Sequence, residues 1–162
     1  MYHSKKWQKK KSESAIKITP ENITKILQAQ VDMAQHFSDV LCKTLKQCLF
    51  ISNYPQNGHD NWLLFPTYDD ELLTIGFIEN GNYLLDSDFI YKRIYKFHPK
   101  DSPLPEQSKY YSELFHIGIL KPYNRFFPKS QCKLRIDGKQ RKRYFCIPQS
   151  VINLDIHTLH WV

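Results

Sequence analysis

Apolar residues recur at intervals of three and four between residues 20 and 48, which is the spacing of one face of an α-helix. Thr19, Pro20 and Glu21 mark its start, because threonine caps helices, proline is tolerated at the first helical position and an acidic side chain favours the first turn. Ser38-Asp39 offers a second cap inside the segment. We therefore expect a break near residues 36–38, although one long helix satisfies the same spacing.

Short apolar runs in the middle of the chain predict β-strands. The runs cover residues 62–65, 72–79 and 82–85, and Asn80-Gly81 separates the last two. An Asn-Gly pair between two such runs is a strong hairpin signal, because both residues tolerate a positive φ angle. We expect a hairpin there, and a loop over residues 53–58, which are rich in turn-forming residues.

Two further helices are expected between residues 86 and 117. Asp86-Ser87-Asp88 supplies a cap and acidic side chains for a helix that continues to about Phe97. The next helix is predicted from about Pro105 to Ile117, and Gly118 is placed to end it because glycine readily adopts the left-handed conformation. Ile119-Leu120 is expected to begin a strand.

A final strand pair is predicted near the end of the chain. Two β-like arms, Cys132–Ile136 and Lys142–Ile147, flank a turn, and Pro148 ends the second arm. The tail, residues 151–162, is half apolar and is expected to pack back as a strand or a helix.

The register of this last hairpin is left open by the sequence. A hairpin centred on Lys139 places Cys132 opposite Cys146. A two-residue turn at Asp137-Gly138 instead places Cys132 opposite Arg143.

Length and composition fit a folded domain with attached segments. Of 162 residues, 41% are hydrophobic and 14% are aromatic, which is too apolar for a disordered chain. The order helix, hairpin, two helices, strand and basic hairpin is that of a winged-helix domain, whose hairpin, the wing, lies along the phosphate backbone. We predict an α+β fold with a disordered basic arm (1–15), an N-terminal helix (16–36), a winged-helix-like domain (37–150) and a C-terminal tail (151–162).

Positive charge is segregated along the chain. The net charge is +7; residues 1–11 hold five lysines and no acid, whereas residues 12–120 hold nine cations and fourteen acids. Residues 121–143 hold nine cations against Asp137 alone: Lys121, Arg125, Lys129, Lys133, Arg135, Lys139, Arg141, Lys142 and Arg143. A polyanionic partner explains this distribution, and nucleic acid is the commonest such partner. A surface that serves only solubility usually mixes both signs.

The basic hairpin predicts a phosphate-binding surface. Strand alternation places Lys133 and Arg135 on one face and Leu134 and Ile136 on the other, so one face can pack on a core while the other meets phosphate. Charges on a hairpin can also serve only to protect a sheet edge, but a net charge of +8 over residues 121–143 exceeds that need. The candidate nucleic-acid-binding residues are Lys109, Lys133, Arg135, Lys139, Arg141, Lys142 and Arg143.

The third predicted helix is poorly equipped to read bases. It offers Gln107 and Lys109 but also two acids, Glu106 and Glu113. Phosphate contacts give affinity and little sequence reading, so we expect weak sequence specificity. The adjacent tyrosines at 110–111 are able to stack on the bases of a single strand, although helical spacing favours core packing for one of them.

Signals for catalysis or metal binding are weak. His59-Asp60 and His157-x-x-His160 lack further ligands at short spacing, and Asp69-Asp70-Glu71 has the composition of a solvated loop. The four cysteines form no CxxC pair and are expected to be thiols. No phosphate-binding glycine loop, nucleophile elbow or HExxH motif occurs. We expect no enzyme activity and no cofactor.

A membrane location is not indicated. No apolar run approaches the length of about 18 residues that a membrane span needs. The basic N-terminus is not followed by the apolar stretch of a secretory signal, so we expect a cytoplasmic protein without a membrane partner. The sequence leaves the oligomeric state open.

Four segments resemble the C-terminal domain of TraI-type conjugation proteins, the nickase/helicases of integrative elements and plasmids. They are FSDVLCKTLKQCLFISN (Phe37–Asn53), NGNYLLDSDFIYKRI (Asn80–Ile94), YYSELFHIGILKP (Tyr110–Pro122) and KLRIDGKQRKRYFCIP (Lys133–Pro148). The chain is also similar to the basic winged helices that end some mobile-element helicases. The first resemblance covers about residues 37–150 and implies a winged-helix-like fold and a DNA-handling role in gene transfer.

The resemblance implies DNA binding by the matching cations of the hairpin, Lys133, Arg135, Arg141, Lys142 and Arg143. The nickase function of that family belongs to a separate N-terminal region without a counterpart in these residues, so no strand cleavage is implied. Two alternatives remain. One is a protein-interaction module that docks on a relaxase, a helicase or another acidic partner, which apolar surface at Phe126-Phe127 or in the tail at 157–162 would favour. The other is RNA binding.

Overall fold

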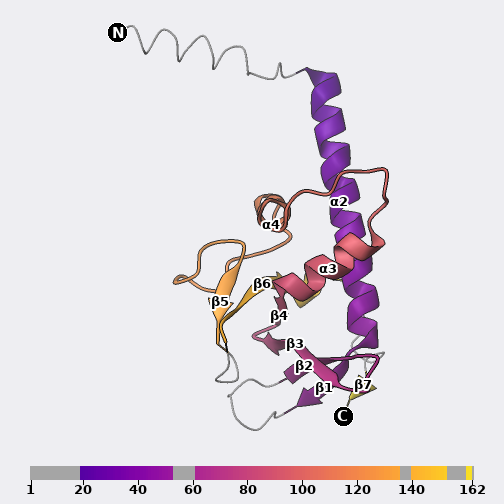
Figure 1. Cartoon of the computed structure of the whole chain (residues 1–162). Coiled ribbons are helices and arrows are strands. Elements are labelled where there is room, and N and C mark those ends of the chain that lie inside the picture. Colours follow the sequence, from indigo (N-terminus) through magenta and orange to yellow (C-terminus); the bar gives the residue numbers. More distant parts are fainter. Residues whose placement is uncertain (1–18, 53–60, 136–139, 153–159, 162) are drawn as a thin grey trace, which may run out of the picture. The chain divides into compact units, whose positions relative to one another are not determined.

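The described strands form one sheet of seven strands, in the spatial order β5-β6-β4-β3-β2-β1-β7 (Figure 1). The strands are β1 (Leu49–Ser52), β2 (Asn61–Pro66), β3 (Leu72–Glu79), β4 (Asn82–Asp86), β5 (Cys132–Leu134), β6 (Lys142–Pro148) and β7 (His160–Trp161). Neighbouring strands are antiparallel, except that β7 of the C-terminal tail runs parallel to β1. The described residues also form three α-helices, α2 (Pro20–Gln47), α3 (Ser87–Phe97) and α4 (Gln107–His116), and the short 3-10 helix η1 (Gln149–Val151). The predicted α+β class is confirmed.

The computed structural model describes residues 19–52, 61–135, 140–152 and 160–161. Several predictions made from the sequence lie outside these ranges: the arm at 1–15, the loop at 53–58, the pair His59-Asp60, Ile136, Lys139 and His157. Residues up to Met33 and residues from Ala34 onward form two separate units, and the sheet belongs to the second.

The predicted break near residues 36–38 is wrong, because α2 continues through it. The carbonyl of Thr19 accepts the amide of Ile23 at 3.0 Å, as expected for the start of the helix. Asp39 does not cap a second helix; its carboxylate accepts a hydrogen bond of 2.9 Å from the side chain of Gln35, one turn earlier. Phe37 is buried at this point, so packing against the core holds the helix together despite the capping residues.

The Asn80-Gly81 hairpin is confirmed. Asn80 and Gly81 have φ angles of 53° and 76°, and they join β3 to β4 with Glu79 paired to Asn82. Positive φ at both central residues gives a turn whose twist matches that of the flanking strands. The local sequence was therefore sufficient to predict this turn and the strand pair that it joins.

The starts and ends of α3 and α4 also follow local signals, with one correction. Asp86 caps α3, and its Oδ1 atom accepts the amides of Asp88 and Phe89 at 3.1 Å each. Gly118, at a φ angle of 86°, ends α4 as predicted. The strand expected at residues 119–120 does not form, because both amides instead donate to the carbonyl of Leu114 at the end of α4. Pairing resumes only as an isolated bridge between Lys121 and Cys146.

The two faces of the sheet are covered by different elements. On one face, Phe145 of β6 contacts Phe37 of α2 and Tyr111 of α4, with ring centroids 5.7 and 5.0 Å apart. On the other, Tyr144 and Cys146 pack with other buried residues of the sheet, against Tyr123 and Phe127 of the loop at 121–131. Successive residues of β6 thus serve opposite faces, as strand geometry requires. Both halves of the core fix the position of the hairpin formed by β5 and β6.

Candidate nucleic-acid interface

The hairpin of β5 and β6 adopts neither of the two registers considered from the sequence. Cys132 pairs with Tyr144, Lys133 with Arg143 and Leu134 with Lys142. The centre of the hairpin therefore falls at residue 138. This register is not that of a two-residue turn at Asp137-Gly138, so turn signals alone were unable to fix the pairing.

The hairpin divides into an apolar face and a cationic end. Cys132 is buried and Leu134 is partly buried against the cluster that includes Tyr144, whereas Lys133 and Arg135 are exposed. Arg141, Lys142 and Arg143 are exposed as well. The predicted alternation is thus observed over residues 132–135. The remaining predicted hairpin cation, Lys139, lies outside the described residues.

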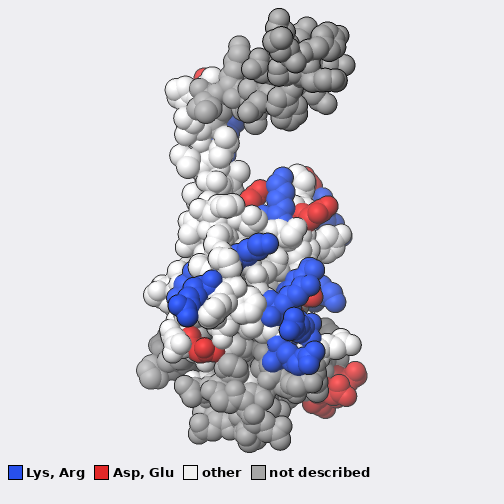
Figure 2. All heavy atoms as spheres, turned by 90° about the vertical axis from the view of Figure 1, so that its left-hand side faces the viewer, with Lys and Arg blue, Asp and Glu red and all other residues white. Residues whose placement is uncertain are grey.

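An open hollow of about 790 Å³ lies beside this cationic end. Lys133, Arg141, Lys142 and Arg143 of the hairpin line it together with Lys92 of α3. Asp86 and Asp88, at the start of α3, are the acidic lining residues among those described. Figure 2 shows lysine and arginine side chains in several groups on the face turned to the viewer, the largest of them on the right. The hollow therefore carries a local excess of positive charge.

Lys92 is not among the candidate residues predicted from the sequence. It joins the hairpin because β4 pairs with β6 and α3 begins directly after β4. This pairing joins residues about sixty positions apart, and no short-range pattern encodes it. The sequence did contain one signal for the position of Lys92, the Asp86 cap, which determines where α3 starts.

Of the two acids that line the hollow among the described residues, Asp86 has a close cationic partner. Its Oδ2 atom lies 3.9 Å from Nζ of Lys142, and its other oxygen caps α3. Burial raises the pKa of the Asp86 carboxyl, while the amide of Phe89 and the charge of Lys142 act in the opposite direction. Its charge is thus divided between the helix cap and Lys142, which leaves Lys133, Arg141 and Arg143 available to a ligand.

The helix α4 contributes little to this surface. Lys109 is exposed on α4 but is not among the residues that line the hollow. Tyr110 and Tyr111 are both buried, and the hydroxyl of Tyr111 donates to the carbonyl of Ser87 at 2.7 Å. Neither ring is therefore free to stack on a base. Gln107 is also occupied, because its amide donates to Asp88 at 2.6 Å.

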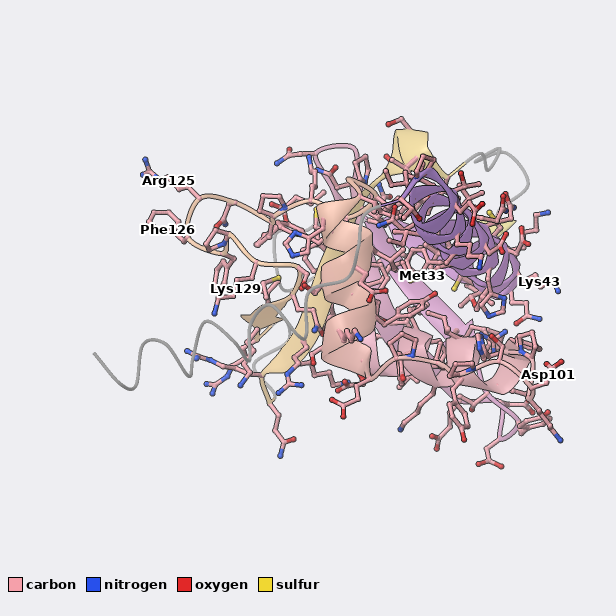
Figure 3. The ribbon with its side chains drawn as sticks, turned by 90° about the horizontal axis from the view of Figure 1, so that it is seen from above. Met33, Lys43, Asp101, Arg125, Phe126 and Lys129 are labelled. Atoms are coloured by element: carbon pink, nitrogen blue, oxygen red, sulfur yellow. The ribbon has the colours of Figure 1, made fainter. Side chains whose placement is uncertain are left out.

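The loop at 121–131 projects an aromatic side chain. Phe126 is 72% exposed, and the guanidinium carbon of Arg125 lies 4.8 Å from the centroid of its ring. Figure 3 shows both side chains pointing away from the ribbon at the end of the loop. The backbone is fixed there, because Oδ1 of Asn124 accepts the amides of Phe126 and Phe127.

The cysteines are free thiols, as predicted. Burial raises the pKa of Cys48 and of Cys132 to about 12, and that of Cys146 to about 11. Within the described residues, no group of three His, Cys, Asp or Glu side chains is arranged to hold a metal ion. In the same residues, no helix has the length and apolar content needed to cross a bilayer.

Comparison of the chain with protein-family models, with curated proteins and with solved structures finds no match to any of them.

Proposed function

We propose that this chain binds DNA through phosphate contacts of the β5–β6 hairpin, with low sequence specificity and without catalysing a reaction. The observation that carries the proposal is the cationic group around the hollow. Among the described lining residues, five cations stand against two acids: Lys92, Lys133, Arg141, Lys142 and Arg143 against Asp86 and Asp88. Exposed lysine and arginine side chains are the usual ligands of the phosphate backbone.

Low specificity follows from the rest of the surface. The side chain of Gln107 is bonded to Asp88, and the tyrosines of α4 are buried. A helix that reads bases needs exposed donors and acceptors in a row, which α4 lacks in its described residues. The hairpin is thus proposed to act as the wing of a winged-helix-like domain, contacting backbone rather than base edges.

DNA is favoured over RNA by the resemblance to TraI-type conjugation proteins. The same resemblance supports a role in the transfer or processing of mobile-element DNA. Lys109, Arg135 and Lys139 complete the proposed phosphate contacts. Exposed cations of this kind also support binding to RNA, so the experiment includes it.

The test is fluorescence anisotropy with labelled duplex DNA, single-stranded DNA and RNA of equal length, each titrated across salt. We expect the logarithm of the duplex association constant to fall with the logarithm of salt concentration, by about 0.9 for each phosphate neutralised. The double variant Arg141→Glu/Arg143→Glu keeps Lys142 with Asp86 and should abolish most binding. Lys25→Glu/Lys100→Glu is the matched control, because both of these lysines are exposed and lie outside the hollow.

Two results would contradict the proposal. One is the absence of binding to any of the three nucleic acids at low salt. The other is an equal loss of affinity in the hairpin variant and in the control, which would show that net charge matters and the hairpin does not.

The exposed ring of Phe126 supports a second candidate function, docking on a protein partner that is acidic and offers an apolar pocket, such as a relaxase or a helicase. Exposed aromatic and arginine side chains are typical anchors of protein interfaces. The variant Phe126→Ser should leave salt-dependent DNA binding unchanged and weaken such a complex. A Phe126→Ser variant that loses DNA affinity would instead assign the ring to the DNA-binding surface.

A further inference from the structure

A second hollow, of about 610 Å³, lies where the ends of α2 and α3 meet the residues that follow β2. Lys46 of α2, Arg93, Lys96 and Phe97 of α3, and Phe65 and Tyr68 contribute to its lining. None of the described lining residues is acidic. Asp69-Asp70-Glu71 follows Tyr68 in the same turn but does not line the hollow.

Arg93, one of the lining residues, is held in place by two hydrogen bonds. Its Nε atom donates to Oγ1 of the buried Thr44 at 2.8 Å, and its NH2 group donates to Oε1 of Gln47 at 3.2 Å. Both acceptors are neutral, so these bonds orient the guanidinium without cancelling its charge. A cation held in place by neutral partners is preorganised for an anion.

Aromatic rings lie close to two of the cations that line this hollow, Arg93 and Lys96. The guanidinium carbon of Arg93 lies 4.7 Å from the ring centroid of Phe65 and 5.4 Å from that of Phe97. Nζ of Lys96 lies 5.5 Å from the centroid of Phe97. The ring of Phe97 is 42% exposed and that of Tyr68 is fully exposed. The hollow thus combines aromatic surface for a planar ring with cations for an anionic group.

We propose that this second hollow binds a nucleoside phosphate unit, the base stacking on Tyr68 and Phe97 and the phosphate meeting Lys46, Arg93 and Lys96. Proteins that bind single strands combine aromatic stacking surfaces with cations in this way. A base that is paired within a duplex does not offer its faces, so the unit is one of a single strand or a free nucleotide.

The strand is the source that the surroundings favour. Lys92 lines the hollow beside the hairpin, while its neighbour Arg93 lines the second one. The rings of Phe65 and Phe89, one from each lining, lie 5.1 Å apart. One strand is therefore able to follow α3, about 16 Å long at 1.5 Å per residue, from the hairpin into the second hollow. Only the choice of a strand over a free nucleotide rests on the proposed function. The second hollow shares no described lining residue with the hollow beside the hairpin, so the binding of a nucleoside phosphate there does not depend on that function.

The test compares two single strands of equal length, an oligothymidylate and an abasic strand with the same phosphates. Wild-type protein should bind the oligothymidylate more tightly, because only that strand stacks. Tyr68→Ala and Phe97→Leu should each weaken binding of the oligothymidylate by about fivefold or more and leave the abasic strand unchanged. Both substitutions remove a stacking ring, and leucine at 97 keeps apolar packing.

Tyr95→Ala is the matched control, because Tyr95 is 70% exposed on α3 and does not line the hollow. It should change neither affinity. Equal wild-type affinity for the two strands, or unchanged binding by Tyr68→Ala and Phe97→Leu, would overturn the inference.

Thymidine monophosphate separates the two sources of the ligand. It should shift the backbone amide resonances of Tyr68 and Phe97 in NMR spectra, with an affinity well below that of the oligothymidylate. Inorganic phosphate alone should bind more weakly still. Equal affinity for the monophosphate and the strand would overturn the choice of a strand.

The hairpin variant separates this inference from the proposed function. Arg141→Glu/Arg143→Glu should weaken binding of both strands but leave the shifts caused by thymidine monophosphate intact. If the hairpin variant binds like wild type while Tyr68→Ala does not, the proposed function fails and the second hollow stands.

Discussion

Lys133 and Arg143 lie directly opposite each other in the β5–β6 pair. Like charges in directly opposed positions destabilise a sheet, while opposite charges there contribute about 0.2–1 kcal/mol. Both side chains are exposed, and both line the hollow beside the hairpin. The repulsion between the two cations lowers the stability of the free protein. A phosphate that binds between or beside them is attracted to both and offsets this repulsion.

The first prediction follows from this pair. Lys133→Glu should raise the free energy of unfolding by up to about 1 kcal/mol, because a repulsive cross-strand pair becomes attractive. The same change should lower DNA affinity, since it adds a negative charge to the hollow. Thermal denaturation and anisotropy measure the two effects. Lys133→Gln is the control and should fall between wild type and Lys133→Glu in both; lower stability in Lys133→Glu would contradict the argument.

The second prediction concerns Asp86. Asp86→Asn keeps a side chain that caps helices well, so the unfolding free energy at neutral pH should change by no more than about 1 kcal/mol. Removal of the negative charge should increase DNA affinity. Asp101→Asn, an exposed acid outside the hollow, should leave affinity nearly unchanged.

The pH dependence of the Asp86 variant has a definite sign. Burial raises the pKa of Asp86 in the folded protein, so folding favours its protonated form. This contribution to stability is present at low pH and is lost as the pH rises through the raised pKa. The affinity difference between wild type and Asp86→Asn should therefore shrink as the pH falls through that value. A difference that grows on acidification would show that another group controls it.

The third prediction concerns the thiols. Cys48, Cys132 and Cys146 are buried with raised pKa values, whereas Cys42 is partly exposed. The reactive species is the thiolate, so a thiol reagent should label Cys42 first in the folded protein. Mass spectrometry after brief labelling identifies the site, and denatured protein, in which all four cysteines should react, is the control. Rapid labelling of Cys132 would mean that the hairpin opens from its core.

The fourth prediction tests the packing of the sheet behind the hairpin. A Cβ atom at Gly76 of β3 would collide with the backbone carbonyl of Leu84 in β4. Backbone is unable to yield as a flexible side chain does, so Gly76→Ala should destabilise the protein by about 1–3 kcal/mol or more. Chemical denaturation measures this. Thr74→Ala, two residues earlier on the same strand, is the control and should cost less.

Local sequence signals predicted most helices and strands of this fold, but they did not predict which of these elements pair or pack with one another. Asp86, Asn80-Gly81 and Gly118 act through their own backbone angles and nearest amides, so the sequence around them is sufficient. A break near residues 36–38 was favoured over one long helix, because the continuity of α2 at Phe37 depends on burial by residues far along the chain. Ile119-Leu120 looked like a strand, but hydrogen bonds to the end of α4 took its amides.

The candidate site divides in the same way. Lys133, Arg141, Lys142 and Arg143 were predicted from charge segregation within one short segment, and they line one hollow. Lys92 entered it only through the pairing of β4 with β6, which the sequence does not reveal. The second hollow was missed for the same reason, because its lysine, arginine and aromatic residues come from segments that are separate in the sequence.

The two ends of strand β6 should differ in how well they tolerate mutation. Lys142 and Arg143 are exposed, whereas residues 144–147 are buried and serve both faces of the sheet. Selection for a folded protein alone should therefore accept nearly any residue at the first two positions and few at the next four. Selection for partner binding should also constrain the first two. Within β6, mutational profiles gathered under the two selections should differ at Lys142 and Arg143 and agree from Tyr144 onward. The peptide bond between Arg143 and Tyr144 therefore separates positions constrained by recognition from positions constrained by folding.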